Sequence, residues 1–207
     1  MCIKIVIYMD NYDTIEVIEH DISGLYYIDN LNEDNMHKII SQLDECQWLP
    51  LSSNSNSRLV QHYGYKYDYK TYNINVKTFD IPPFLNYLKN MLYDICIQLN
   101  IIDNDYDFNQ CIVNNYLSGQ GISKHVDVKK YGSVIGCFTL GSGATMTFKN
   151  KDKTHDLYVK PNSLYIMSGD SRYIWSHEMV PKKYDTINNN KIYRDRRVSV
   201  TFRNVPL

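Results

Sequence analysis

The second half of the chain consists of short runs of β-forming residues with no helical pattern between them, and this feature restricts the fold most strongly. Gly, Asn, Asp and Pro residues that favour turns separate the runs. A parallel α/β sheet needs a crossover, usually a helix, between successive strands, so the pattern excludes it and favours a two-sheet fold such as a jelly roll, the double-stranded β-helix. We expect strands over residues 111–117, 133–140, 144–149, 156–160, 163–168 and 197–203.

The first half predicts two amphipathic helices. Asn32 can cap the first, which has acidic residues in its first turn and is expected to end near residues 48–50. Pro82 and Pro83 open the second. Each has one apolar face at helical spacing, formed by Met36, Ile39, Ile40 and Leu43 and by Phe84, Tyr87, Leu88, Met91, Leu92 and Ile95. We therefore predict one α+β, mainly β domain over residues 1–207, with the helices against one outer face of the jelly roll.

Charge and cysteine usage restrict the partner and the compartment. Of the 22 basic and 23 acidic residues, two and ten respectively lie in residues 1–50, so bases exceed acids by seven in the rest of the chain. That surplus suits a nucleic-acid partner, although ordinary solvated charges would also produce it.

The five cysteines are scattered and form no C-x-x-C pair, which indicates reduced thiols in an intracellular protein, cytoplasmic or nuclear.

Two further segments give expectations about the chain's surroundings. The apolar residues 2–9 are too short for a signal-peptide core or a membrane span, so we expect a strand there and no membrane attachment. Residues 182–190 are polar and rich in Asn, which predicts an exposed loop. A monomer is expected.

A metal-ligand pattern lies within the β-rich region. His125 and Asp127 are two residues apart, so in an extended strand both side chains point to the same face. His177 follows four expected strands later, and a β-barrel can bring such a later strand back beside the first. Two imidazoles and one carboxylate on one face of an octahedron leave three positions open, which suits iron(II) oxygenases.

Taken alone this pattern is weak, because an H-x-D pair often arises by chance and each histidine could be an ordinary half-buried residue. The C-terminal strand strengthens it. Residues 197–203 alternate, so Arg197 and Arg203 share one face with Ser199 and Thr201. Two arginines on one strand face need anions to balance their charge. A dicarboxylate would provide them, with one planar guanidinium forming a bidentate pair with its distal carboxylate.

At these positions the chain resembles the AlkB family of iron(II)- and 2-oxoglutarate-dependent dioxygenases, over nearly its whole length. The resemblance implies that His125, Asp127 and His177 bind iron(II), with dioxygen and 2-oxoglutarate as co-substrates. It also implies that Arg197 binds the distal carboxylate of 2-oxoglutarate and that Arg203 lies near the metal-bound end of that molecule.

Two more motifs support the resemblance. Asn114-Asn-Tyr116 is similar to the family's N-x-Y strand, whose Asn and Tyr contact 2-oxoglutarate. Gly64-Tyr-Lys-Tyr67 is similar to the G-Y-x-Y of the substrate lid, which we expect near residues 52–80. Each motif is common alone, but their joint occurrence in the right order is highly specific.

Within the family, the chain most resembles the dioxygenase domain of the animal tRNA wobble-uridine hydroxylases. Repair members place an acid two positions after the metal aspartate, where it can face a cationic methylated base, and this chain has Lys129 there. We therefore expect hydroxylation of a modified uridine in single-stranded RNA, unless Lys129 points to solvent and plays no part. The animal enzymes also contain RNA-recognition and methyltransferase domains, for which this chain has no room, so their tRNA specificity cannot simply be carried over to it. A partner methyltransferase is a further expectation.

The substrate base has to leave its stack to reach a metal inside a barrel. Aromatic and basic residues are expected to stack on it and to bind phosphates, although surface or core packing would explain each of them equally well, except Tyr65, which matches the family motif. The candidates are Arg58, His62, Tyr65, Tyr67, Lys129, Arg172 and Trp175. The alternatives to wobble-uridine hydroxylation are oxidative demethylation of N-alkylated bases in DNA or RNA, an oxygenase of protein or lipid, and a non-catalytic binding module.

Overall fold

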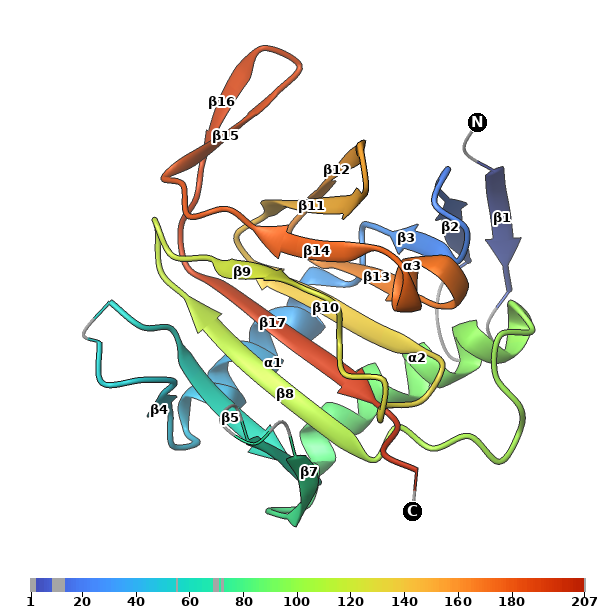
Figure 1. Cartoon of the computed structure of the whole chain (residues 1–207). Helices are drawn as coiled ribbons and strands as arrows, with labels where there is room; N and C mark the ends of the chain where they lie inside the picture. Colours follow the sequence, from blue (N-terminus) through green and yellow to red (C-terminus); the bar gives the residue numbers. More distant parts are fainter. Residues whose placement is uncertain (1–2, 9–13, 55, 69–70, 72, 207) are drawn as a thin grey trace.

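The computed structural model describes residues 3–8, 14–54, 56–68, 71 and 73–206, with the side chains of 73 and 75 set aside. Two antiparallel sheets face each other as the two layers of a jelly roll (Figure 1), which confirms the predicted fold class. The large sheet runs in the order β1 (Ile3–Ile7), β2 (Ile15–Glu19), β3 (Leu25–Ile28), β13 (Ser163–Met167), β10 (Ile135–Gly141), β17 (Arg197–Arg203), β8 (Gln110–Tyr116), β5 (Leu59–Tyr63) and β4 (Leu49–Pro50). The small sheet runs in the order β12 (Lys153–Val159), β11 (Ala144–Asn150), β14 (Ser176–Met179) and β9 (Ile122–His125).

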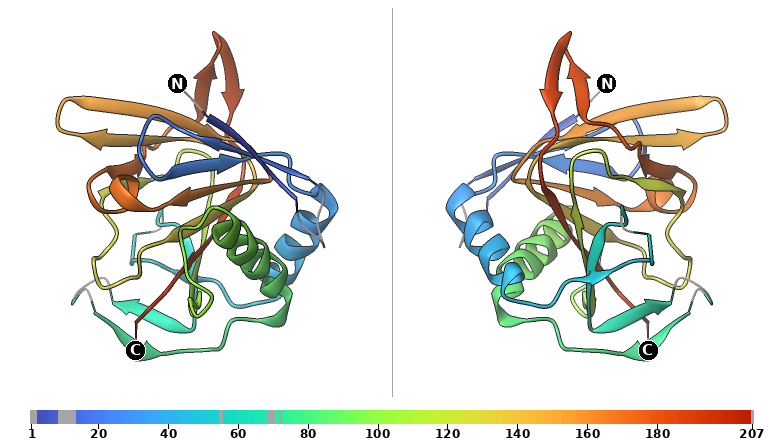
Figure 2. Two further views of the ribbon diagram at one scale, coloured as in Figure 1. Left: turned by 90° about the vertical axis from the view of Figure 1, so that its right-hand side faces the viewer. Right: turned by 90° about the vertical axis from the view of Figure 1, so that its left-hand side faces the viewer.

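The two predicted helices cover the outer face of the large sheet, as expected (Figures 1 and 2). The first is α1 (Glu33–Asp44), and the Asn32 side chain caps it by accepting a 3.0 Å hydrogen bond from the backbone N–H of Asn35. The second begins with the 3-10 turn η1 (Pro83–Leu85) and continues as α2 (Asn86–Gln98). Their apolar faces pack against alternate residues of β10, β17 and β8, and this packing forms the main hydrophobic core.

Strand β17 shows how this packing positions the site. Val198, Val200 and Phe202 face the helices and are at most 1% exposed. Because successive side chains of a strand point to opposite faces, Arg197 and Arg203 face the interior of the roll instead. The burial of the valines and the phenylalanine therefore fixes the direction of both arginines.

Several local features differ from the sequence-based expectation. The first helix ends at Asp44 and not near residues 48–50, and strands β9 and β14 lie outside the ranges where strands were expected. Residues 182–190 were expected to be a loop, but they lie largely in a hairpin of β15 (Tyr184–Ile187) and β16 (Asn190–Tyr193). Asn188 and Asn189 both have positive φ, and asparagine tolerates this left-handed conformation, which tight hairpin turns require. The short helix α3 (Gly169–Tyr173) precedes β14, where no helix was expected. A second hairpin, β6 (Tyr65–Asp68) with β7 (Asn73–Lys77), follows β5.

Other expectations concern the chain's surroundings. Cys96, Cys111 and Cys137 are free and buried, and Cys46 is free and partly buried, whereas Cys2 lies outside the described residues. Strand β1 occupies residues 3–7 of the apolar opening segment. Among the described residues, no helix is both long and apolar enough to cross a membrane.

Candidate metal centre and active site

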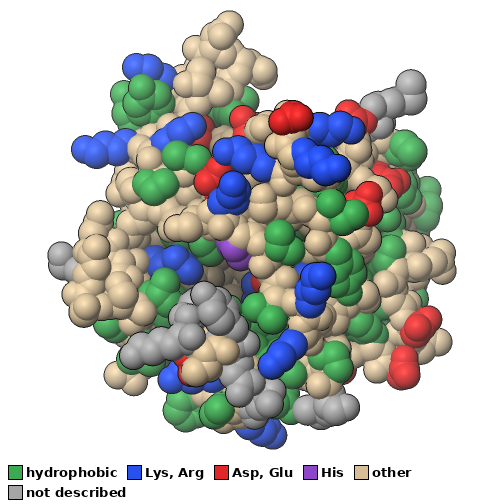
Figure 3. All heavy atoms as spheres, viewed as in Figure 1, with side chains coloured by type: hydrophobic (Ala, Val, Ile, Leu, Met, Phe, Trp, Pro, Cys, Tyr) green, Lys and Arg blue, Asp and Glu red, His purple; other side chains and the backbone are tan. Residues whose placement is uncertain are grey.

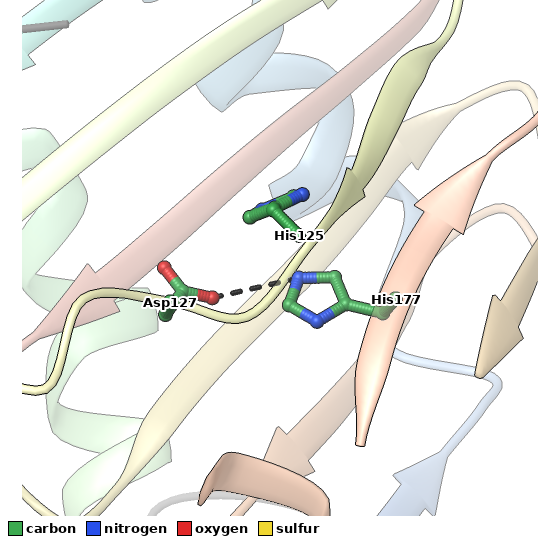
Figure 4. Close-up of side chains that lie close together, drawn as sticks. All are labelled: His125, Asp127 and His177. Atoms are coloured by element: carbon green, nitrogen blue, oxygen red, sulfur yellow. Dashed lines mark ion pairs between the residues drawn. The ribbon is translucent and has the colours of Figure 1, made fainter. Parts of the chain in front are cut away.

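Pairing of β9 with β14 brings the three candidate metal ligands together. His125 and His177 are directly opposite each other in this pair, with ring centroids 4.3 Å apart. Asp127 follows two residues after the end of β9, and its Oδ2 lies 3.4 Å from Nε2 of His177 (Figure 4). One potential ligand atom from each residue lies within 4.8 Å of the other two. The structure thus unites residues that are far apart in the sequence.

The two oxygens of Asp127 have different surroundings. Oδ1 accepts a hydrogen bond from Nε of Arg203 at 2.9 Å, and the ion pair also places Nη2 of Arg203 2.8 Å from Oδ1. Oδ2 is buried, faces His177, and has no hydrogen-bond partner among the described residues. A buried acceptor without a partner is costly, and a cation beside it would remove that cost. Arg203 therefore orients the carboxylate and leaves one oxygen for a metal ion.

The protonation states of the ligands also favour a metal ion. Nδ1 of His125 lies 2.8 Å from the carbonyl oxygen of Ser123, so Nδ1 holds the proton and Nε2 keeps a free lone pair. Burial, with His125 nearby, lowers the pKa of His177 to about 3, so this imidazole is neutral. Burial, the largest single effect, would raise the pKa of the Asp127 carboxyl, but Arg203 together with His177, His125 and Arg172 outweighs it and holds that pKa well below its usual range. Two neutral imidazoles and one carboxylate are the donor set that suits iron(II).

Arg172 holds the segment that follows the metal aspartate. Its guanidinium donates hydrogen bonds to the carbonyl oxygens of Asp127, Val128, Tyr131 and Gly132, at 2.7 to 3.3 Å. Arg172 is 1% exposed. It was expected to contact substrate phosphate, and the structure corrects this, because the group is enclosed by protein carbonyls. Its position fixes the course of the chain from Asp127 to Gly132.

We expect Arg172→Met to destabilise the protein by about 3 kcal/mol or more, because the carbonyls would lose their partner in a buried place. Metal affinity should fall as well, since Asp127 would no longer be held in position. Urea unfolding and manganese titration measure the two effects. Lys130→Met, an exposed lysine of the same segment, is the matched control and should change neither. Wild-type stability in Arg172→Met would contradict the role given to this arginine.

An inner pocket lies between the metal ligands and the large sheet. Arg197 is 4% exposed, and its Nη2 donates to Oγ1 of Thr139 at 2.9 Å, whereas its Nε has no hydrogen-bond partner among the described residues. The guanidinium lies 5.5 Å from the ring centroid of Tyr116. The lining also includes Asn114, Cys137, Met146, Tyr165, Met167, Ser199, Thr201 and Arg203. A buried guanidinium beside hydroxyl groups and close to a metal centre can bind a small dicarboxylate.

An outer cavity of about 380 Å³ opens from the metal ligands towards solvent. It shares Asn114, Ile122, His125, Asp127 and Arg203 with the inner pocket. Figure 3 shows a histidine side chain at the floor of a hollow in this face, with Lys and Arg side chains on several sides of it. The rest of the lining includes Arg58, Tyr67, Lys124 and Tyr131. A substrate in the outer cavity would meet a co-substrate in the inner pocket at the metal centre.

The expected substrate residues occupy different places. Arg58 and Tyr67 line the outer cavity. Arg58 donates from Nε to Oδ1 of Asn114 at 2.8 Å, and its guanidinium lies 5.6 Å from the ring centroid of Tyr116. The other expected residues are not part of the lining. Tyr65 packs against the small cluster of Ile74, Tyr131 and Val205. Trp175 packs against the core between the sheets, and Lys129 is exposed to solvent.

His62 also lies outside the described lining, and burial lowers its pKa to about 4. Two lining residues, Lys124 and Tyr131, were not predicted from the sequence. Lys124 directly precedes His125, and this neighbourhood was the available signal. The sequence contains no comparable signal for Tyr131, because this residue reaches the cavity only through the segment that Arg172 holds in position.

Comparison with known proteins agrees with this geometry. The family model described as the 2OG-Fe(II) oxygenase superfamily matches residues 30–203, so the chain belongs to that superfamily. Its dioxygenase chemistry uses iron(II), 2-oxoglutarate and dioxygen. The chain is 38% identical over 182 residues to the uncharacterized protein L905 of Acanthamoeba polyphaga mimivirus, covering 86% of this chain and 82% of that one.

Other relatives show that the chain is AlkB-like. It is 32% identical over 186 residues to the tRNA (carboxymethyluridine(34)-5-O)-methyltransferase alkbh8 of Xenopus tropicalis, covering 80% of this chain but 29% of the frog protein. The Alkylated DNA repair protein ALKBH8 homolog of Arabidopsis thaliana is 28% identical, with 90% of this chain and 60% of the plant protein covered. The solved structure of OsALKBH1 has the same fold, with a TM-score of 0.64 at 17% identity, covering 90% of this chain and 99% of that one.

Proposed function

We propose that this AlkB-like dioxygenase hydroxylates a modified uridine at the wobble position of tRNA, on a substituent that ends in a carboxylate. The main support is the charge of the outer cavity. Arg58, Lys124 and Arg203 line it, and Asp127 is the one acid among its described lining residues. Because Arg203 already pairs with Asp127, Arg58 and Lys124 give the cavity a positive surplus. A carboxylate would be attracted to this surplus, whereas a cationic methylated base would be repelled.

The positive surplus of the cavity comes from Arg58 and Lys124 and not from Lys129. Lys129 is exposed and absent from the described lining, so its charge acts on the cavity from a distance and through solvent. Lys124 and Arg58 are part of the wall itself. The name of the frog relative, which refers to carboxymethyluridine at position 34, points to the same class of substrate.

In the proposed reaction, the bound iron, with dioxygen and 2-oxoglutarate, supplies the oxidising power. Within the protein, His125, Asp127 and His177 hold the metal, and Arg197 with Tyr116 and Asn114 holds 2-oxoglutarate in the inner pocket. Arg203 orients Asp127. Tyr67 and Tyr131 present aromatic rings to a flipped-out or unstacked base, which aromatic side chains bind by stacking.

Mass spectrometry of nucleosides tests this proposal. Transfer RNA would be incubated with the protein, iron(II) and 2-oxoglutarate, then digested and compared with an untreated sample. We expect one added oxygen on a modified uridine and an equal amount of succinate. Oxidation of a 1-methyladenine oligonucleotide with unchanged tRNA would instead favour oxidative demethylation, which the name of the Arabidopsis relative supports. Succinate release with peptide but not with nucleic acid would point to a protein oxygenase.

The positive surplus of the outer cavity predicts a preference for a negatively charged substrate, which substitution of the two basic residues should reduce. We expect Lys124→Gln and Arg58→Gln each to lower, by roughly tenfold, the preference in kcat/KM for a carboxymethyl-uridine substrate over its uncharged carbamoylmethyl counterpart, the scale of one hydrogen bond to a charged group. Lys130→Gln removes an exposed charge outside the cavity lining and is the control. An unchanged preference in both cavity variants would argue against recognition of the carboxylate by these residues.

Three further expectations belong to this proposal. The region near residues 52–80, which includes β5, β6 and β7, would act as a substrate lid, because Arg58 and Tyr67 reach the cavity from it. The protein would act as a monomer on intracellular tRNA. A separate methyltransferase would supply or consume the modified uridine.

A further inference from the structure

The hairpin of β15 and β16 projects beyond the two sheets, as Figures 1 and 2 show. It is firmly anchored. Arg194 forms two hydrogen bonds with Asp185, at 2.6 and 2.7 Å, and the exposed fractions of these two side chains are 5% and 2%. Arg194 also donates to the carbonyl oxygen of Val180 at 2.8 Å. Such a buried, bidentate pair gives the hairpin a fixed direction.

The exposed part of the hairpin combines aromatic rings with positive charge. Tyr184 and Tyr193 are cross-strand partners with ring centroids 5.8 Å apart, and Tyr193 is 71% exposed. The ammonium group of Lys191 lies 4.8 Å from the centroid of Tyr184. Lys182 and Lys183 are exposed at the base. Asp185 is neutralised by Arg194, and the exposed Asp195 follows at the base, so the exposed charges of this region are three lysines against one acid.

We infer that this hairpin is a second contact for single-stranded nucleic acid, outside the catalytic cavity. The three lysines would bind phosphates, and the exposed face of Tyr193 would stack on a base. Charge selects this partner over a second copy of the chain, because two such hairpins would bring like charges together. The hairpin is also connected to the site, since the carbonyl oxygen of Lys182 accepts a 3.2 Å hydrogen bond from Gly119, in the segment that joins β8 to β9. The base of the hairpin therefore contacts the segment that leads into β9, and the residues of β9 line the outer cavity.

The test measures binding of fluorescent single-stranded RNA and DNA by anisotropy over a range of salt concentrations, without metal or 2-oxoglutarate. Binding should weaken in the triple variant Lys182→Gln/Lys183→Gln/Lys191→Gln. The slope of the logarithm of the association constant against the logarithm of the salt concentration should also become shallower by about 2, because each phosphate contact on a single strand contributes about 0.7. The triple variant Lys38→Gln/Lys151→Gln/Lys153→Gln makes the same change in net charge at exposed lysines elsewhere and should keep the wild-type slope.

Stacking is tested separately. Tyr193→Ala should weaken binding of single strands roughly fivefold or more, as expected for loss of one base–aromatic stack. Tyr8→Ala, at a tyrosine that is 76% exposed near β1, should have no effect. Wild-type binding in Tyr193→Ala and in the hairpin triple variant would overturn the inference. A hairpin variant that binds RNA normally but changes the oligomeric state would overturn it too, in favour of a contact between copies.

This inference relies on the proposed function only in taking nucleic acid as the partner. Oxidation of tRNA without any contribution of the hairpin to binding would refute the inference and leave the proposed function intact. Hairpin-dependent binding without oxidation of any nucleoside would support the inference and refute the proposed function.

Discussion

Replacing His177 by alanine should lower metal affinity by more than 100-fold and abolish succinate production. Loss of a residue that merely supports a ligand typically costs 10- to 100-fold in metal affinity, so loss of a ligand should cost more. His177 is buried directly opposite His125, and no other described histidine, cysteine or acid joins this cluster. Calorimetric titration with manganese(II), which binds as iron(II) does without being oxidised, would measure the affinity.

His37→Ala provides the control for this experiment. His37 is an exposed histidine on α1, on the outer face of the large sheet, and its removal should leave the affinity unchanged. Circular dichroism of the His177→Ala protein would show whether it remains folded. A folded His177→Ala variant with wild-type metal affinity would place the metal centre elsewhere.

Replacing Arg197 by lysine should weaken 2-oxoglutarate binding by roughly 10- to 100-fold, because an ammonium group cannot reproduce the planar, two-pronged grip of a guanidinium on a carboxylate. The side chain is buried between Thr139 and the ring of Tyr116, so water cannot readily take over the lost contact. Binding would be followed by anaerobic titration of the metal-loaded protein with 2-oxoglutarate.

The neighbouring arginine provides a matched control. Arg196 points to the opposite face of the sheet, where it pairs with Asp44 of α1 and donates from Nε to Asn115 at 3.1 Å. Arg196→Lys should therefore affect stability more than co-substrate affinity. Equal loss of 2-oxoglutarate affinity in both variants would mean that the effect comes from general disturbance of β17.

The parts of the fold that depend on local periodicity could be predicted from the sequence. Alternation in β17 showed that Arg197 and Arg203 share a face, and the position of Asn32 indicated the start of α1. The convergence of His125 with His177 could be inferred but not demonstrated, because it depends on strand pairing across intervening strands. Resemblance to a family supported it where local chemistry could not.

Features that depend on distant contacts could not be predicted. Arg172 has the sequence context of a surface cation, and only the folded structure shows four carbonyl groups converging on it. The segment containing Asn188 and Asn189 has the composition of a loop, yet the buried pair of Asp185 and Arg194 closes the base of the hairpin. In both cases the hydrogen-bond partners of a buried arginine are set by the tertiary fold, and no short-range sequence pattern identifies them.

A crystal structure of the protein with manganese(II) and 2-oxoglutarate would test the central claim most directly. We predict one ion within about 2.0–2.3 Å of His125, Asp127 and His177, with Oδ2 as the ligand atom of the aspartate. The distal carboxylate of 2-oxoglutarate should pair with Arg197 in the inner pocket. An ion bound without these three residues, or a distal carboxylate paired with Arg58 in the outer cavity, would contradict the account.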